Sequence, residues 1–175
     1  EKQVAESGLT DSEVLEALDV DSFFGLLNLR RPEQKSAVVA EFVNQDMVRP
    51  QDDGGYAITN LGALLVARKL SDFAALRKRV LRVIRFDGKG CIDILDDQFF
   101  DEGYATAISR AESYIMSAVP SREMADGAFR RVVRDYPQRA VRELLSNTVI
   151  HQDLSNATVG PTVGIYSNRI EFSNP

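Results

Sequence analysis

The stretch from residue 136 to 153 constrains the fold most, because it has a clear beginning and one periodicity. Pro137 suits the first position of a helix, where its fixed φ is helical and its missing N–H would be unpaired anyway. From there, side chains suited to a core recur at helical spacing and fall on one half of the cylinder. They are Ala140, Val141, Leu144, Leu145, Thr148 and Val149. The sequence therefore predicts a helix over 137–152 with one buried face.

Three polar residues, Glu143, Asn147 and His151, stand at i, i+4 and i+8 of this helix, so they share one side of it. A carboxylate, a carboxamide and an imidazole offer a base, an oxygen ligand with two N–H donors, and a group that titrates near neutral pH. The same spacing also fits a plain solvated stripe, since Glu-x-x-x-Asn occurs by chance in many helices. The helix alone leaves both interpretations open.

Motifs around the helix resemble those of a known family. They are Tyr136-Pro137, Arg142-Glu143, Asn147 and His151-x-Asp153, followed by a segment over 163–175 that ends Arg-Ile-Glu-Phe-Ser-Asn-Pro. This compound pattern resembles the GHKL-type ATPase domain at the C-terminal end of bacterial and archaeal transcriptional regulators that are often labelled RecG-like. The resemblance covers residues 136–175 and includes both halves of the motif.

In that superfamily the helix is the N-box, so the resemblance implies a site for ATP and Mg²⁺. Glu143 would polarise the attacking water, and Asn147 would hold Mg²⁺ and phosphate oxygens. A base within one water of the γ-phosphate and a neutral oxygen ligand for Mg²⁺ suit these roles. His151 and Asp153 would occupy the family's His-Arg-Asp positions at the same site.

Two departures from the family pattern bear on activity. Gln152 stands where the family has Arg, which removes a fixed positive charge that could meet phosphate. The pattern stops at Pro175, where the family continues with glycine. We therefore expect ATPase activity, if any, only in an intact protein, and none in this chain by itself. The resemblance also implies DNA binding through a Schlafen-like or Alba-type domain outside these residues, and it allows a homodimer.

The amino-acid composition says more about the cellular compartment of the protein than about its function. No apolar run approaches the ~20 residues that a membrane span needs, so no membrane partner is expected. Cys91 is the single cysteine, which excludes an intrachain disulfide and favours a cytoplasmic location. Within an expected strand, Cys91 is interpreted as a small core residue. A chain that starts without Met and ends inside a motif is expected to be part of a longer one.

Residues 1–75 are expected to form a helical, winged-helix-like part. Thr10 and Glu13 have the spacing of a capping box, apolar spacing predicts a helix over 33–46, and Asp-Gly-Gly predicts a hairpin over 47–59. The same regulators carry a similar stretch. Residues 11–60 hold ten acidic and four basic side chains, a net charge of −6 that would repel duplex DNA. We therefore expect a packing or spacer role for this part.

Residues 76–175 are expected to form an α+β part with a small, mostly antiparallel sheet that ends in a partial GHKL-like sandwich. Alternating side chains predict two strands within 80–95, and a hairpin over 158–173 whose apolar face lies on the helix of 137–152. The acidic residues of 96–102 are expected to cap a helix starting at Tyr104 rather than to hold a divalent cation. The basic run over 68–85 is interpreted as a solvated or internally paired surface.

Two functions of different classes follow. In the first, the chain belongs to a nucleotide-responsive transcriptional regulator that relays ATP binding to a DNA-binding domain outside these residues. In the second, it is a non-catalytic interaction or scaffold module with a degenerate nucleotide site. There, Glu143, Asn147 and His151 would form a hydrogen-bonded stripe that fixes the helix against the sheet.

Overall fold

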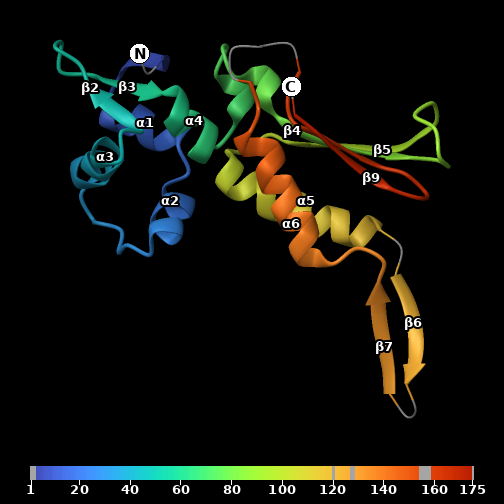
Figure 1. Cartoon of the computed structure of the whole chain (residues 1–175). Coiled ribbons are helices and arrows are strands. Elements are labelled where there is room, and N and C mark those ends of the chain that lie inside the picture. The colour runs from blue at the N-terminus through green and yellow to red at the C-terminus, as the bar shows by residue number, and fades with distance from the viewer. Residues whose placement is uncertain (1–2, 120, 127–128, 154–158, 175) are drawn as a thin grey trace.

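The computed structural model describes residues 3–119, 121–126, 129–153 and 159–174, with the backbone only for 121–126 and 129–134. It is an α+β fold, as expected (Figure 1). The strands are β1 (Val4–Leu9), β2 (Val48–Pro50), β3 (Tyr56–Thr59), β4 (Leu81–Phe86), β5 (Ile94–Phe100), β6 (Ser121–Asp126), β7 (Phe129–Arg134), β8 (Thr162–Ile165) and β9 (Ile170–Ser173). The helices are α1 (Asp11–Ala17), α2 (Val20–Leu27), α3 (Lys35–Asn44), α4 (Asn60–Val66), α5 (Tyr104–Ala118) and α6 (Gln138–Ile150), with short 3-10 turns η1 (Leu70–Asp72) and η2 (Arg77–Arg79).

The N-terminal part contains helices α1 to α4 and a three-stranded sheet in the order β1-β3-β2. The predicted capping box is present: Glu13 N donates to Thr10 Oγ1 at 3.4 Å, and Thr10 N donates to the Glu13 carboxylate at 2.8 Å. The predicted hairpin forms from β2 and β3, with Val48 opposite Ile58. Strand β1 was not predicted, because it is an edge strand whose mostly exposed side chains lack an apolar alternation.

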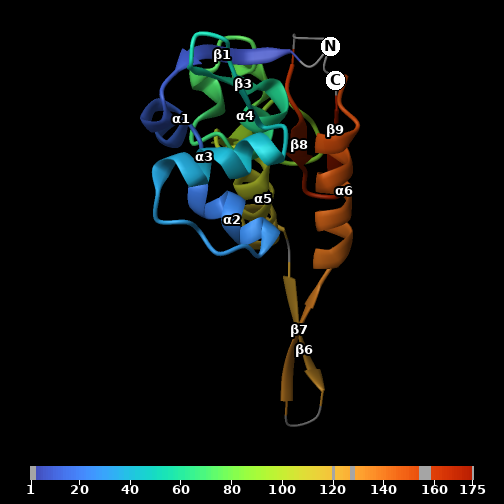
Figure 2. The same cartoon turned by 90° about the vertical axis from the view of Figure 1, so that its left-hand side faces the viewer.

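The second sheet has the order β5-β4-β8-β9, with β4 and β8 parallel and the other pairs antiparallel. Alternate residues such as Val83, Val163 and Ile165 are buried towards α5 and α6. Within the described residues, both of these helices lie on the same side of the sheet (Figures 1 and 2). The hairpin of β6 and β7 projects away from the rest of the chain.

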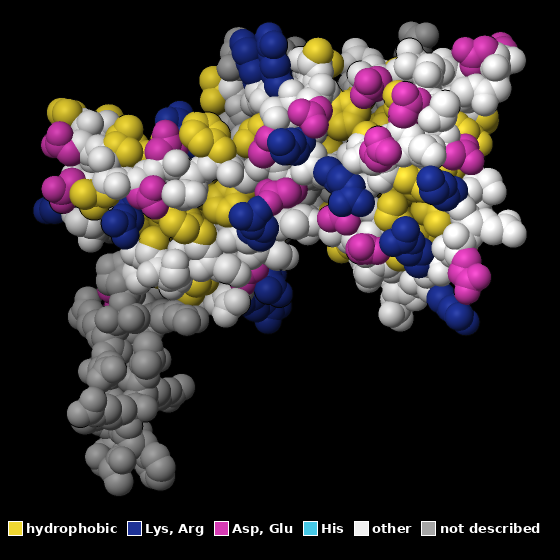
Figure 3. All heavy atoms as spheres, turned by 180° about the vertical axis from the view of Figure 1, so that it is seen from behind, with side chains coloured by type: hydrophobic (Ala, Val, Ile, Leu, Met, Phe, Trp, Pro, Cys, Tyr) yellow, Lys and Arg dark blue, Asp and Glu magenta, His cyan; other side chains and the backbone are white. Residues whose placement is uncertain are grey.

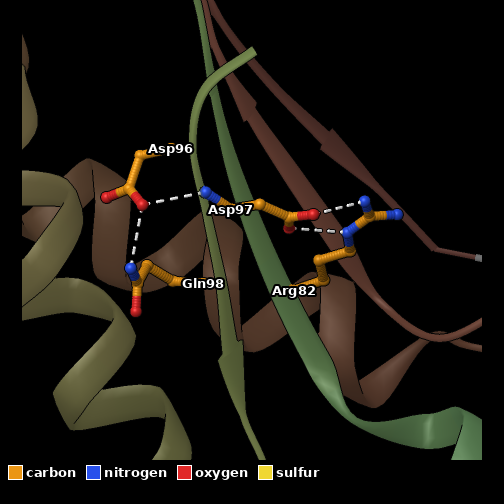
Figure 4. Close-up of polar contacts among 4 residues, drawn as sticks. All are labelled: Arg82, Asp96, Asp97 and Gln98. Carbon is orange, nitrogen blue, oxygen red and sulfur yellow. Dashed lines mark hydrogen bonds and ion pairs between the residues drawn. The ribbon is translucent and has the colours of Figure 1, made fainter.

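The prediction that acidic residues cap α5 was wrong. Gly103 is the N-cap and has no side chain to cap with. Asp96 and Asp97 belong instead to β5, which runs to Phe100 and so begins and ends later than expected. Figure 4 shows the reason: Asp97 turns to one side of the strand towards Arg82, while Asp96 and Gln98 lie on the other side. Cross-strand pairing, which the sequence does not display, keeps these carboxylates in a sheet.

The interpretation of Cys91 as a core residue was also wrong. Its side chain is exposed, and it lies in the bend between β4 and β5 rather than in a strand. The neighbouring Ile92 is 87% exposed, so the short apolar run there does not enter the core. A run of β-prone residues next to a glycine turn was therefore mistaken for a buried strand.

The core continues from the N-terminal part into the second part. Gly103 N donates to Ala67 O at 2.8 Å, and a Cβ on Gly103 would lie 2.5 Å from the Leu65 carbonyl oxygen. Ser22 Oγ lies 2.9 Å from Thr106 Oγ1, which links α2 with α5. The division of the chain into a part over 1–75 and a part over 76–175 stays a prediction. Among the described helices, none is both long and apolar enough to cross a membrane.

Helix α6 forms close to where it was predicted, with Pro137 as its N-cap. Val141, Leu145, Thr148 and Val149 are buried, against α5 and β9. Ala140 is exposed and Leu144 is 47% exposed, so the buried face is narrower than expected. The hairpin of β8 and β9 also forms, and Asn168 lies in its turn. Residues 154–158, which include the predicted start of this hairpin at 158, lie outside the described residues.

Candidate functional site

The three polar residues that α6 carries at helical spacing are all exposed. Glu143, Asn147 and His151 share the side of the helix that faces away from its buried seam. Within the described part of the chain, their side chains make no hydrogen bond and no ion pair. The scaffold hypothesis expected these side chains to fix the helix against the sheet, and they do not. Asp153, the fourth predicted site residue, is exposed just beyond the helix.

Another group holds the first half of α6 in place. Glu112 on α5 has only 3% of its side chain exposed, and its carboxylate accepts hydrogen bonds from Gln138 Nε2 and Arg142 Nε, both at 2.7 Å. The Arg142 guanidinium lowers the pKa of Glu112, so this carboxylate stays ionised in the interior. Arg142, a motif residue, therefore serves the packing of α6 on α5.

A second buried group holds the other end of α6. Gln152 is 9% exposed, and its Nε2 donates to Val149 O at 2.8 Å and to Tyr104 OH at 3.0 Å. Tyr104 OH in turn donates to Arg79 O at 2.6 Å. Burial raises the pKa of Tyr104 to about 12. At the position where the family has Arg, this chain thus has an amide that is used inside the fold. Sequence reasoning missed this network because it joins residues 79, 104 and 152.

The two halves of the compound motif meet in the structure. Asn174, from the segment after β9, donates from Nδ2 to the carbonyl oxygen of His151 at 2.8 Å. This bond connects the Asn-Pro end of the second half with the last turn of α6. In the family pattern the glycine comes two positions after this asparagine, and Asn174 is bound to the C-terminal end of the helix.

A hollow of about 650 Å³ lies beside Glu143, and its described walls are Gln138, Arg139, Arg142 and Glu143. The guanidinium of Arg142 is held by Glu112, but Arg139 has no ion pair within the described residues. A carboxylate and an unpaired guanidinium one helical turn apart offer a base and a phosphate-binding cation. Sequence reasoning did not assign Arg139, although it stands four residues before Glu143. No cluster of three or more His, Cys, Asp or Glu side chains suited to a metal occurs in the described part.

The basic run over 68–85 does not form one cationic surface. Arg79 is 2% exposed, and Arg82 is held by Asp97, as the internally paired interpretation expected. The view from behind in Figure 3 shows lysine and arginine side chains interspersed with acidic and hydrophobic ones.

The comparisons with known proteins support a fold, but they identify no family for this chain. No protein-family model matches this chain, and no curated protein matches it. Among solved structures, the chain is similar to the DIP2311 protein of Corynebacterium diphtheriae, with 20% identity and a TM-score of 0.50 over 68% of this chain. The similarity covers 22% of that protein, so this chain spans about a fifth of its length. At this identity the similarity supports the α+β fold alone.

Proposed function

We propose that this chain contributes one wall of a nucleotide site to a GHKL-type, RecG-like transcriptional regulator of the cytoplasm. ATP with Mg²⁺ binds along the exposed side of α6. Asn147 holds Mg²⁺ and phosphate oxygens, Glu143 orients the attacking water, and His151 and Asp153 border the nucleotide near the helix C-terminus. DNA is bound by a domain outside these residues, and the chain by itself does not hydrolyse ATP.

The observation that carries this proposal is the hydrogen bond from Asn174 to the carbonyl of His151. It joins the two halves of the motif at the C-terminal end of α6, two residues before the position where the family pattern continues with glycine. The exposure of Glu143 and Asn147 supports it further, because neither side chain is used within the described fold. Arg139, beside Glu143 in the same hollow, supplies a cation in a site where Gln152 has replaced the family's Arg.

A second candidate is a scaffold module, and Gln152 favours it. The amide of Gln152 is buried against Tyr104, and it leaves the site without the charge that the family places there. In this alternative, the interlocked helices α5 and α6 present a surface to a partner, and nucleotide has no role. The two candidates differ in whether Asn147 meets a ligand.

Calorimetric titration of the intact protein with MgATP tests the proposal. Wild type is expected to bind, and Asn147→Ala is expected to bind at least about tenfold more weakly, because hydrogen bonds and metal ligation through the amide are lost. Asn44→Ala is the matched control, since Asn44 is also an exposed asparagine on a helix. Binding that Asn147→Ala leaves unchanged, or no binding by wild type, favours the scaffold candidate.

A further inference from the structure

A second hollow, of about 560 Å³, opens where β4 and β8 begin. Its walls come from η1 and η2, from the end of β5 and from the residues that lead into β8. The wall residues that matter for binding are Arg77, Lys78, Val80, Arg82, Phe99 and Val159. A volume of about 300–1,000 Å³ is typical of small-molecule sites. None of these residues belongs to α6, so this hollow is separate from the nucleotide site proposed above.

One wall is an exposed aromatic ring. Phe99 is 59% exposed and lies directly opposite Arg82 in the pairing of β4 with β5. The central carbon of the Arg82 guanidinium lies 5.1 Å from the centre of the ring, within the range of a cation–π contact. Val159 is 57% exposed in the same hollow, and Val80 is partly buried. Together these side chains form an apolar surface on which a flat apolar group can pack.

The guanidinium of Arg82 is held rigidly. Its Nε and Nη2 donate to the two carboxylate oxygens of Asp97 at 2.8 and 2.7 Å, and this pairing lowers the pKa of Asp97 (Figure 4). Nη1 has no hydrogen-bond partner within the described residues. A planar guanidinium fixed by a bidentate pair loses little freedom when the N–H donors of its Nη1 bind an anion.

The hollow carries a small excess of positive charge. Arg77 and Lys78 are exposed and form no ion pair within the described part of the chain. Asp101 also faces the hollow, but its carboxylate accepts from Ser71 N at 2.9 Å and Ser71 Oγ at 2.5 Å. Three cations thus stand against the two carboxylates of Asp97 and Asp101. The excess is one positive charge, which matches a ligand with one negative charge.

The backbone holds these walls together tightly. A Cβ on Gly160 would lie 2.5 Å from Lys78 O and 2.7 Å from Val80 O, so only glycine allows the two segments to approach this closely. Arg82 N donates to Pro161 O at 3.0 Å in the same region. The cations of η2 and the apolar side chains beside β8 are therefore fixed relative to each other.

We infer that this hollow binds a small organic anion that carries a flat apolar ring and one negative charge, such as an aromatic carboxylate. The ring lies against Phe99 and the two valines. The carboxylate meets Arg77, Lys78 and Nη1 of Arg82. For a regulator this would be an effector site, but the inference does not depend on nucleotide binding at α6.

Titration of the full chain with 2-naphthoate, followed by ¹H–¹⁵N NMR, tests the inference. Saturable shifts are expected in residues 77–82 and 99–101. The neutral 2-naphthamide has the same rings and is expected to bind at least about tenfold more weakly, because it lacks the charge-assisted hydrogen bonds. Phe99→Ala and Lys78→Ala are each expected to weaken 2-naphthoate binding by about tenfold.

Matched controls separate this site from a general effect of surface chemistry. Leu95→Ala removes a 54% exposed apolar side chain from the same strand, and Lys89→Ala removes an exposed cation from the turn between β4 and β5. Both controls are expected to bind 2-naphthoate as wild type does. Equal binding of 2-naphthamide, an equal loss in the controls, or shifts outside the named residues would overturn the inference. Because all four positions are exposed, the variants are expected to fold, which their thermal unfolding checks.

Discussion

The two sides of helix α6 use polar residues in opposite ways. Towards the core, Gln152 and the partners of Glu112 are tied by hydrogen bonds that cross from one element to another. On the outer side, Glu143 and Asn147 are exposed and make no such bonds within the described residues. Removing a polar side chain that is hydrogen-bonded inside the fold lowers the stability of the protein, whereas removing an exposed polar side chain changes the stability little. The outer side is therefore free to serve a ligand, and the inner side is not.

The largest contrast is expected between two adjacent leucines. Leu145 is fully buried, so Leu145→Ala is expected to lower the free energy of unfolding by about 3 kcal/mol, through lost transfer energy and the cavity it leaves. Leu144 is 47% exposed, and Leu144→Ala is expected to cost less than about 1 kcal/mol. Urea unfolding followed by circular dichroism measures both. Similar losses of unfolding free energy in the two variants would mean that the buried side of α6 has been assigned wrongly.

The next contrast is between two glutamates. Glu112→Gln weakens two hydrogen bonds to the buried carboxylate, with an expected loss on the order of 1–2 kcal/mol at pH 7, while Glu143→Gln should change stability by less than about 0.5 kcal/mol. The pKa of Glu112 lies below its ordinary 4.5 in the fold. Its contribution is thus present above that value and is lost as pH falls through the lowered pKa.

Acid unfolding checks the sign of this effect. Wild type and Glu143→Gln are expected to lose stability together below pH 4.5, and Glu112→Gln is expected to lose less over the same interval. If Glu112→Gln shows the full wild-type pH dependence, the carboxylate does not hold α5 to α6.

A smaller effect is expected at the tyrosine that supports Gln152. Tyr104→Phe removes the hydrogen bond to the carbonyl of Arg79 and one of the two hydrogen bonds that Nε2 of Gln152 donates, at a cost of about 1–2 kcal/mol. The pKa of Tyr104 is raised from 10.0 to about 12, so the folded protein keeps this proton when the unfolded chain has lost it. Stability should therefore fall as pH rises from 10 to 12, and less steeply in Tyr104→Phe. Alkaline urea titrations measure the slope, and equal slopes would contradict the assignment.

Sequence periodicity predicted the elements whose signals are local. The capping box at Thr10, the hairpin of β2 and β3, and helix α6 after Pro137 all depend on residues a few positions apart. The missed elements depend on distant partners. Strand β1 is defined by pairing with β3, and Asp96 and Asp97 stay in β5 because Tyr114 and Arg82 bind them.

The candidate site was predictable only in part, for the same reason. Spacing placed Glu143, Asn147 and His151 on one side of a helix, and the structure has them there, exposed. It did not indicate that Gln152 would be buried against Tyr104, or that Glu112 would hold Arg142, because these partners lie 30 or more residues away. Whether the exposed residues bind nucleotide stays a prediction.

The most direct test uses His151, the single histidine of this chain. In the intact protein its imidazole NMR signal, assigned by its loss in His151→Gln, reports on the outer side of α6. MgATP is expected to shift this signal saturably in wild type and in Asn44→Ala, and not in Asn147→Ala at the same concentrations. A signal that stays unchanged at MgATP concentrations that saturate the protein, or an equal shift in Asn147→Ala, would contradict the assignment of the outer side of α6 to nucleotide.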